Sequence, residues 1–215
     1  MDIQEWEQRY IEATYNAKEA LPYLDGMFVA YNSNIDAIKH LSEENVCKLI
    51  ENFSEAEIQE RVETYPREIK EPLDLMARLI ISMREGKAAE IPAHNSDIHE
   101  WLKEHLGFDY ARMGGQAGII SNLLASLGLK KVVAYVPWLS EEQARYFVDT
   151  DNLFYPEIEN GKVILKHPQE ASKPGTESKV NWILEYSKDL KIACDGSNFK
   201  VPRDNRLIII LQEEK

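Results

Sequence analysis

Three glycines within five positions stand directly before an apolar stretch, in RMGGQAGIISNLLASLG. Glycine costs up to about 1 kcal/mol in a helix interior, so Gly114, Gly115 and Gly118 are too close together to be ordinary helix residues. Helical spacing predicts a helix over 117–127, and the apolar, β-branched run at 131–137 predicts a strand. A strand, a helix and another strand favour a βαβ unit with a parallel sheet.

Two interpretations of this glycine cluster are open from the residues alone. The first is a tight turn into a packed helix. The second is a main chain that approaches a polar ligand closely, at a helix N-terminus where free N–H groups point outward. GGQAG does not match the G-x-G-x-x-G dinucleotide motif, and the chain has neither a Walker A loop nor a G-x-S-x-G motif.

Apolar periodicity and turn residues divide the rest of the chain into short elements. Helices are predicted over 3–20, 42–61, 71–86 and 97–108, and strands over 27–32, twice within 153–168, and in WILEYS, LKIACDGSNFKVP and RLIII. The predicted boundary residues are the N-caps Ser42 and Ser54, the helix end Gly86, and the turns at Asn160-Gly161 and Asp195-Gly196. The order predicts an α/β fold with a core domain and a β-rich lid.

Composition excludes several classes of function. The net charge of −12 argues against nucleic-acid binding, which needs a basic surface. No apolar run approaches the length of a membrane span, so no membrane partner is expected. Cys47 and Cys194 are too few for a disulfide framework and are predicted to be free thiols in a reducing cytoplasm. The spacing of His94, His99 and His105 argues against a zinc site, so no metal ligand is predicted.

Two polar motifs lie beside apolar segments. Asn34 and Asp36 follow a predicted strand, at the sheet edge where ligands of α/β proteins bind, and could converge on a polyhydroxylated ligand. The alternative is that they cap the next helix. Glu90 stands between small and apolar residues, where a solvated carboxylate is the alternative to a ligand contact.

Arginines beside prolines form a third motif, in YPR at 65–67 and VPRDNR at 201–206. With Lys179 they could form a basic pocket for a phosphate group, and the alternative is a set of solvated charges. The run RLIII is followed at once by a charged stub, so we expect a chain that is interrupted within a sheet.

Seven motifs in order resemble one family: AYNSNIDAIKHL, YPREI, GKAAEIP, RMGGQAGIISNLLASLG, AYVPWLS, ENGKVILKHP and VPRDNRLI. From about residue 20 to 210 the chain is similar to the archaeal ADP-dependent phosphofructokinases and glucokinases of the ribokinase-like superfamily. The resemblance implies a partial three-layer α/β sandwich with a smaller α/β lid. It assigns 1–37, 88–148 and 204–215 to the large domain, 38–87 and 149–203 to the lid, and leaves the C-terminal nucleotide-binding half absent.

The resemblance also implies roles for individual residues. Asn34 and Asp36 would bind sugar hydroxyls, and Gly114, Gly115 and Gln116 would line the sugar site. Lys179 and Asn181 fall in a lid segment that resembles the part contacting the phosphate of fructose 6-phosphate, and Arg203 is also expected to bind the substrate. Glu90 matches a glucokinase position and would bind a glucose hydroxyl, which implies an enzyme that uses both sugars.

The implied activity is transfer of the β-phosphoryl group of ADP to fructose 6-phosphate, giving fructose 1,6-bisphosphate, and also to glucose, in a modified archaeal glycolysis in the cytoplasm. Mg²⁺ would accompany ADP, with its ligands in the missing half. The family's G-x-G-D motif, whose aspartate is the general base, does not occur in these 215 residues. We therefore expect the chain alone to be inactive. A non-catalytic sugar-binding relic and one half of a split kinase are the alternatives.

Overall fold

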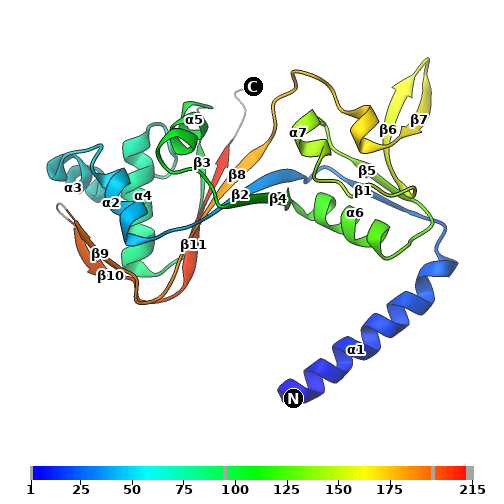
Figure 1. The fold of residues 1–215 in the computed structure, drawn as a ribbon, viewed down its shortest axis with the longest axis horizontal. Helices are drawn as coiled ribbons and strands as arrows, with labels where there is room; N and C mark the ends of the chain where they lie inside the picture. The colour runs from blue at the N-terminus through cyan, green and yellow to red at the C-terminus, as the bar shows by residue number, and fades with distance from the viewer. Residues whose placement is uncertain (1, 94–95, 195–196, 212–215) are drawn as a thin grey trace. The chain divides into compact units, whose positions relative to one another are not determined.

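A computed structural model describes residues 2–93, 96–194 and 197–211 of the chain. The chain divides into two compact units, drawn in Figure 1. Unit 1 consists of Met1–Ile35 and Met113–Ser178, and unit 2 of Asp36–Arg112 and Lys179–Lys215. Each unit is therefore assembled from two stretches that are distant in the sequence.

Unit 1 is built on a four-stranded sheet in the order β1-β5-β6-β7. Its strands are β1 (Met27–Ala30), β5 (Val132–Tyr135), β6 (Leu153–Glu159) and β7 (Lys162–Lys166). β1, β5 and β6 run parallel, which confirms the predicted parallel sheet, and β6 and β7 form the predicted hairpin. Asn160 and Gly161 both have positive φ at its turn, as a two-residue hairpin requires.

The helices of unit 1 are α1 (Ile3–Ala20), a 3-10 turn η1 (Leu21–Tyr23), α6 (Gln116–Ser126), α7 (Glu141–Ala144) and α8 (Pro168–Ala171). α6 packs against β1 and β5. The buried core includes Leu129, Val132, Ala134, Phe147 and Leu153. α1 buries none of its residues. Among the described residues no helix is both long enough and apolar enough to cross a membrane.

Unit 2 is built on a five-stranded sheet in the order β3-β11-β8-β2-β4. Its strands are β2 (Asn34–His40), β3 (Ala89–Ala93), β4 (Tyr110–Gly114), β8 (Val180–Tyr186) and β11 (Asn205–Leu211), and β2 and β4 each have an end in unit 1. β11 lies parallel to β3 and antiparallel to β8. A separate hairpin pairs β9 (Lys191–Cys194) with β10 (Ser197–Lys200).

Four helices belong to unit 2: α2 (Glu43–Ile50), α3 (Glu55–Thr64), α4 (Pro72–Glu85) and α5 (Ser96–His105). The predicted caps are confirmed, because Ser42 and Ser54 each accept a hydrogen bond from the backbone N–H three residues on. Gly86 ends α4 in the left-handed conformation, and a β-carbon there would lie 2.7 Å from Cγ of Pro202. α4 is therefore tied to the segment that leads into β11.

The domain boundaries differ from those expected. Segments 88–112 and 204–211 were assigned to the large domain, but β3 and β11 pair with each other and with β8, which places them in unit 2. The hairpin β6–β7 was assigned to the lid, but β6 pairs with β5 in unit 1. Strand pairing between distant segments decides both cases, and the linear order of elements does not show it.

The cysteine prediction was wrong. Cys47 on α2 and Cys194 at the end of β9 form a disulfide with a Cα–Cα distance of 5.7 Å. The two residues are 147 positions apart in the sequence, so their proximity depends on the fold of unit 2. The predicted turn at Asp195-Gly196 lies outside the described residues, as does His94.

Candidate functional site

The nine residues predicted to bind the substrate fall in both units. Unit 1 holds Asn34, Gly114, Gly115 and Gln116. Unit 2 holds Asp36, Glu90, Lys179, Asn181 and Arg203.

In unit 1 the glycine cluster meets the end of β1, at the carboxyl edge of the parallel strands. The chain leaves β1 through Tyr31, which has a φ of 78°, a conformation that is uncommon outside glycine. The carbonyl of Asn32 then accepts a hydrogen bond of 2.8 Å from the backbone N–H of Ala117, in the first turn of α6. The N-terminus of α6 therefore packs directly on the segment that follows β1.

This close packing explains why glycine occupies two of these positions. Gly115 has a φ of +73°, and a β-carbon at this position would lie 2.5 Å from the carbonyl oxygen of Asn32 and 2.8 Å from Cα of Ser33. A β-carbon at Gly118 would collide with the Met113 side chain and lie 2.7 Å from Oγ of Ser33. Of the two interpretations drawn from the sequence, the tight turn into a packed helix is the one that these contacts support.

Asn34 follows β1, as predicted, but it is also the first residue of β2, and only 2% of its surface is exposed. Beside it, Ser33 accepts a hydrogen bond of 3.0 Å from Nε2 of Gln143, and its own hydroxyl donates to Sδ of Met113. Because buried polar groups need such partners, this network holds the start of β2 in place.

In unit 2 three of the predicted residues share one face of the five-stranded sheet. Nε2 of His40 on β2 lies 3.2 Å from a carboxylate oxygen of Glu185 on β8, so these two side chains lie on the same face. Side chains of a strand alternate between faces, and residues four apart share one. Asp36, four residues before His40, and Asn181, four before Glu185, therefore lie on this face as well.

Glu90 joins the same face through the strand register. It lies opposite Ile208 of β11, and Ile208 lies opposite Ile183 of β8, midway between Asn181 and Glu185. Directly opposed residues project to the same side of a sheet. Glu90 and Asn181 are two strands apart, a lateral spacing of about 10 Å, and Asp36 is on the strand beyond Asn181. We call the surface that bears Asp36, His40, Glu90, Asn181 and Glu185 the polar face.

Helices cover the opposite face of this sheet. Oγ of Ser82 on α4 lies 2.7 Å from the hydroxyl of Tyr186, and Nε1 of Trp182 donates to Nδ1 of His99 on α5 at 2.8 Å. Tyr186 and Trp182 alternate with Asn181 and Glu185 along β8. The sheet thus buries its apolar side beneath α4 and α5.

Asn181 has an unsatisfied acceptor. Its Oδ1 is buried and has no hydrogen-bond partner among the described residues. A buried acceptor without a partner costs about 1–3 kcal/mol, so a hydroxyl or amine brought to this point would be favoured.

The predicted phosphate pocket that combines Lys179 with Arg203 was wrong. Lys179 directly precedes β8, whereas Arg203 lies beyond the other end of that strand, because Asn205 pairs with Tyr186. Six residues of strand separate the two ends, which is about 20 Å. The two arginine motifs are also separated from each other in space. Arg67 lies two residues before Ile69, which bridges to Ala93 at the end of β3, whereas Arg203 precedes the start of β11, which runs parallel to β3.

Ion pairs that no sequence motif indicates anchor the polar face. Asp109 accepts hydrogen bonds of 2.8 Å from Nζ of Lys39 and from the backbone N–H of His40, and it lies 3.1 Å from Nδ1 of His40. The hydrogen bond from Lys39, together with that from the His40 backbone, lowers the pKa of Asp109 to about 2. No motif links residues 39–40 with 109, so only the fold shows this cluster.

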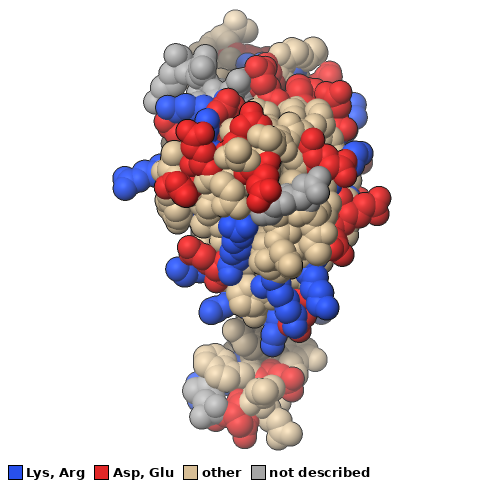
Figure 2. Space-filling model, turned by 90° about the vertical axis from the view of Figure 1, so that its left-hand side faces the viewer, with Lys and Arg blue, Asp and Glu red and all other residues tan. Residues whose placement is uncertain are grey.

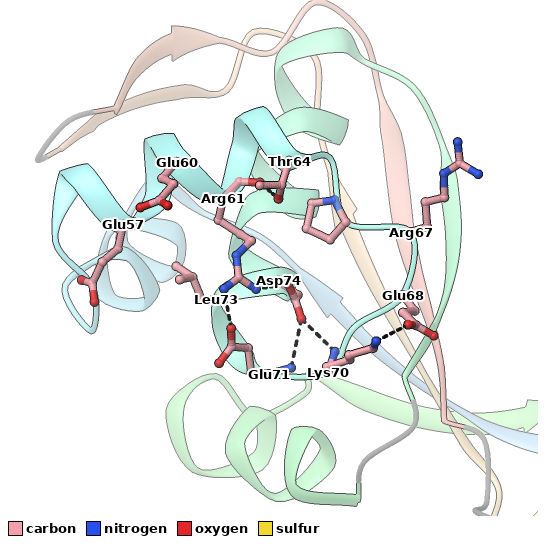
Figure 3. A pocket seen from close by; sticks show the side chains of 11 residues that line it. Glu57, Glu60, Arg61, Thr64, Arg67, Glu68, Lys70, Glu71, Leu73 and Asp74 are labelled. Atoms are coloured by element: carbon pink, nitrogen blue, oxygen red, sulfur yellow. Dashed lines mark hydrogen bonds and ion pairs between the residues drawn. The ribbon is translucent and has the colours of Figure 1, made fainter.

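A pocket between α3 and α4 is a poor ligand site, because several of its charged side chains already pair with one another (Figure 3). Arg61 pairs with Glu71 at 2.6 Å and also with Asp74, and Lys70 pairs with Glu68 at 2.5 Å. Asp74 further accepts from the backbone N–H groups of Lys70 and Glu71. These contacts fasten the segment before α4 to α3.

Surface charge and possible metal ligands also bear on the kind of ligand this chain could bind. On the face of the molecule in Figure 2, acidic side chains predominate in the upper part, and several basic side chains gather below the middle with acidic ones beside them. Within residues 2–93, 96–194 and 197–211, no group of three or more His, Cys, Asp or Glu could hold a metal ion.

Comparison with known proteins shows the family to which this chain is similar. Residues 25–214 match the ADP-specific Phosphofructokinase/Glucokinase conserved region. The chain is 76% identical to an ADP-specific phosphofructokinase of Methanosarcina acetivorans, over 97% of this chain and 43% of that protein. It is 34% identical to an ADP-dependent glucose/glucosamine kinase of Pyrococcus furiosus, over 94% of this chain and 43% of that protein.

Solved structures that resemble this chain come from the same kind of kinase. An ADP-dependent kinase in complex with fructose-6-phosphate and ADPbetaS is 55% identical, with a TM-score of 0.79 over 99% of this chain and 40% of that one. The α/β fold class predicted from the sequence is confirmed. The chain spans less than half the length of these relatives. It belongs to the ADP-specific phosphofructokinase/glucokinase family.

Proposed function

We propose that the chain is the sugar-binding part of an ADP-dependent kinase that phosphorylates fructose 6-phosphate to fructose 1,6-bisphosphate in a modified glycolysis, and that also accepts glucose. The observation that carries this proposal is the polar face of unit 2, where Asp36, Glu90 and Asn181 lie on one side of the sheet, each on a different strand. Two acceptor carboxylates and an amide are the groups that recognise several hydroxyls of one sugar.

Each residue has a distinct task in this proposal. Asp36 accepts hydrogen bonds from sugar hydroxyls, and the unsatisfied Oδ1 of Asn181 accepts a further one. Lys179, exposed at the start of β8, attracts the phosphate of fructose 6-phosphate. Glu90 accepts from a hydroxyl that glucose presents. Arg203 is left out of the site, because it lies at the far end of β8.

The remaining predicted residues belong to unit 1, and their role toward the sugar stays a proposal. Asn34, Gly114, Gly115 and Gln116 surround the junction of β1, β2 and α6. Gln116 is exposed at the first position of α6, where its amide can reach a hydroxyl. Gly115 keeps α6 close to Asn32, so that Gln116 is held at the carboxyl edge of the parallel strands.

Phosphoryl transfer needs groups that these residues do not supply. The 215 residues contain no G-x-G-D sequence, and no metal cluster is found in the described part of the chain. We therefore assign no catalytic base and no metal-dependent step to this chain. We expect Mg²⁺ with ADP to bind residues in the region of the relatives that the chain does not span, and the chain alone to be inactive.

One surface favours an active form that contains a second polypeptide region. Unit 1 exposes three apolar side chains of α6, the leucine that caps its C-terminus, and two apolar side chains of β1, which is an edge strand of its sheet. These are Ile119, Ile120, Leu123, Leu127, Met27 and Phe28. Exposed apolar groups on an edge strand and on the helix that packs against it are typical of an interface. These exposed side chains support the proposal that the chain is one part of a larger kinase, and they argue against a free-standing sugar-binding relic.

Two measurements test the proposal. Calorimetric titration of the chain with fructose 6-phosphate or glucose should show binding that Asp36→Ala weakens about 10-fold or more, as loss of a hydrogen bond to a charged group predicts. Arg203→Ala, a charge removed at the other end of β8, is the matched control and should leave both affinities within about twofold. A loss in Arg203→Ala as large as in Asp36→Ala would contradict the placement of the site.

Activity and specificity are tested separately. The purified chain with ADP, Mg²⁺ and sugar should give no phosphorylated product, and addition of the remaining region of the Methanosarcina acetivorans relative should restore turnover. Turnover by the chain alone would refute its assignment as the sugar-binding part. In the restored enzyme, Glu90→Ala should weaken the use of glucose far more than that of fructose 6-phosphate, and equal losses would remove Glu90 from specificity.

A further inference from the structure

The Cys47–Cys194 disulfide joins the two chain segments from which unit 2 is built. Cys47 belongs to segment 36–112 and Cys194 to segment 179–215. Between them the chain leaves unit 2 and forms residues 113–178 of unit 1. The bond therefore links α2 covalently to the β9–β10 hairpin, between two segments that strand pairing in the five-stranded sheet also holds together.

Both segments contribute to the polar face. Asp36 and Glu90 come from the first segment, and Asn181 and Glu185 from the second. α2, which carries Cys47, begins three residues after His40 ends β2. β9, which carries Cys194, follows β8 after a four-residue connection. The disulfide thus ties together the continuations of two strands that bear the polar face.

Other contacts besides the disulfide also hold α2 and the β9–β10 hairpin together. The backbone N–H of Ala193 donates to Oε1 of Glu43 at 3.2 Å, and Ile192 and Val46 are fully buried. The Arg84 guanidinium lies 5.1 Å from the ring of Phe199, so the hairpin also contacts α4. Unit 2 should therefore fold with the cysteines reduced, and its thiols would remain neighbours. Cys47 and Cys194 are each only half-buried, which leaves the bond accessible to small thiols.

We propose that Cys47 and Cys194 form a reversible redox site, whose oxidation locks the two segments of unit 2 together. The oxidant is a low-molecular-weight disulfide. The thiolate of one cysteine attacks it, forms a mixed disulfide and expels one thiol. The second cysteine then attacks the mixed disulfide, forms the Cys47–Cys194 bond and expels the second thiol. Two protons and two electrons leave the protein in total, and a dithiol reverses both steps.

Because the disulfide closes a long loop of the chain, we expect oxidation to have a large effect on stability. A cross-link between residues 147 positions apart restricts the unfolded chain strongly, and for a chain of this size the corresponding shift in Tm is on the order of 10 °C. Oxidation should act on unit 2 and leave unit 1 unchanged, since neither cysteine belongs to unit 1. Locking also restricts relative movement of the strands that carry Asp36 and Asn181.

The test uses the full chain in buffers of oxidised glutathione or dithiothreitol. Alkylation in denaturant followed by mass spectrometry counts the thiols, and we expect none in the first buffer and two in the second. Tm should fall on reduction in the wild type and should not respond in the double variant Cys47→Ser, Cys194→Ser. Hydrogen exchange should become at least about 10-fold faster in α2 and β9 on reduction, while β5 of unit 1 keeps its rate.

Two results would overturn the proposal. One is a wild-type chain that keeps two free thiols in oxidised glutathione, because the site would then not form. The other is a disulfide that forms but changes neither Tm nor the exchange rates in α2 and β9. If the serine variants fold poorly, the thiol count and hydrogen exchange of the wild type decide the question on their own.

Discussion

Gly115→Ala tests the reason for the glycine cluster most directly. The β-carbon of alanine would lie 2.5 Å from the carbonyl oxygen of Asn32 and 2.8 Å from Cα of Ser33. Both are backbone atoms, so no side-chain rotation relieves the contact. The residue also has a φ of +73°, which L-residues rarely adopt.

The magnitude follows from these two terms. The backbone conformation, with φ 73° and ψ 146°, costs alanine about 1–3 kcal/mol. Forcing a methyl group into a packed position costs about 1–3 kcal/mol more. We therefore expect Gly115→Ala to lower the free energy of unfolding of unit 1 by about 2–6 kcal/mol. Gly128 is a matched control, because it has a φ of +84° but nothing within 4 Å of its β-carbon position, so only the first term applies.

Urea unfolding followed by circular dichroism measures both variants, and hydrogen exchange of the α6 amides reports on unit 1 separately. The reasoning is refuted if Gly115→Ala costs no more than Gly128→Ala. If Gly115→Ala keeps its stability but loses sugar binding, the glycine serves the ligand and not the packing of α6.

Two further predictions concern unit 2. Because the folded-state pKa of Asp109 is lowered to about 2, its hydrogen bonds with Lys39 and the His40 backbone stabilise the protein above about pH 4, and this contribution is lost as the pH falls toward 2. Asp109→Asn should therefore flatten the fall of Tm between pH 4 and 2, and an unchanged slope would contradict it. Ser54→Ala removes the N-cap of α3 and should cost about 1 kcal/mol in urea unfolding, whereas Ser187→Ala, at an exposed serine outside any helix, should be neutral.

Local signals predicted most of the fold. The caps at Ser42 and Ser54, the helix end at Gly86 and the Asn160-Gly161 turn were readable because each depends on a few neighbouring residues. The strands β2, β3 and β4 were missed. β3 contains a proline, and β2 shows no clean alternation because residues on both of its faces are buried. Such strands are recognised only through their partners.

The candidate site was also predicted only in part, because local signals do not show which strands pair. The residue types at Asp36, Glu90 and Asn181 were identified from motifs, but their common face depends on strand register. The pairing of Lys179 with Arg203 failed because β8 and β11 are antiparallel, which places the residues at opposite ends. The disulfide was missed for the same reason, since two cysteines 147 residues apart carry no local sign of proximity.

The position of β11 has a consequence for synthesis of the chain. Of the five strands of this sheet β11 is the last to be synthesised, yet it lies between β3 and β8. Until it is added, β3 and β8 each lack a neighbouring strand on one side. The segments of unit 1 in this chain end at residue 178, so they can begin to fold while unit 2 still lacks an inner strand. A pause in translation before residue 205 would therefore leave a nascent chain with one folded unit and one aggregation-prone sheet.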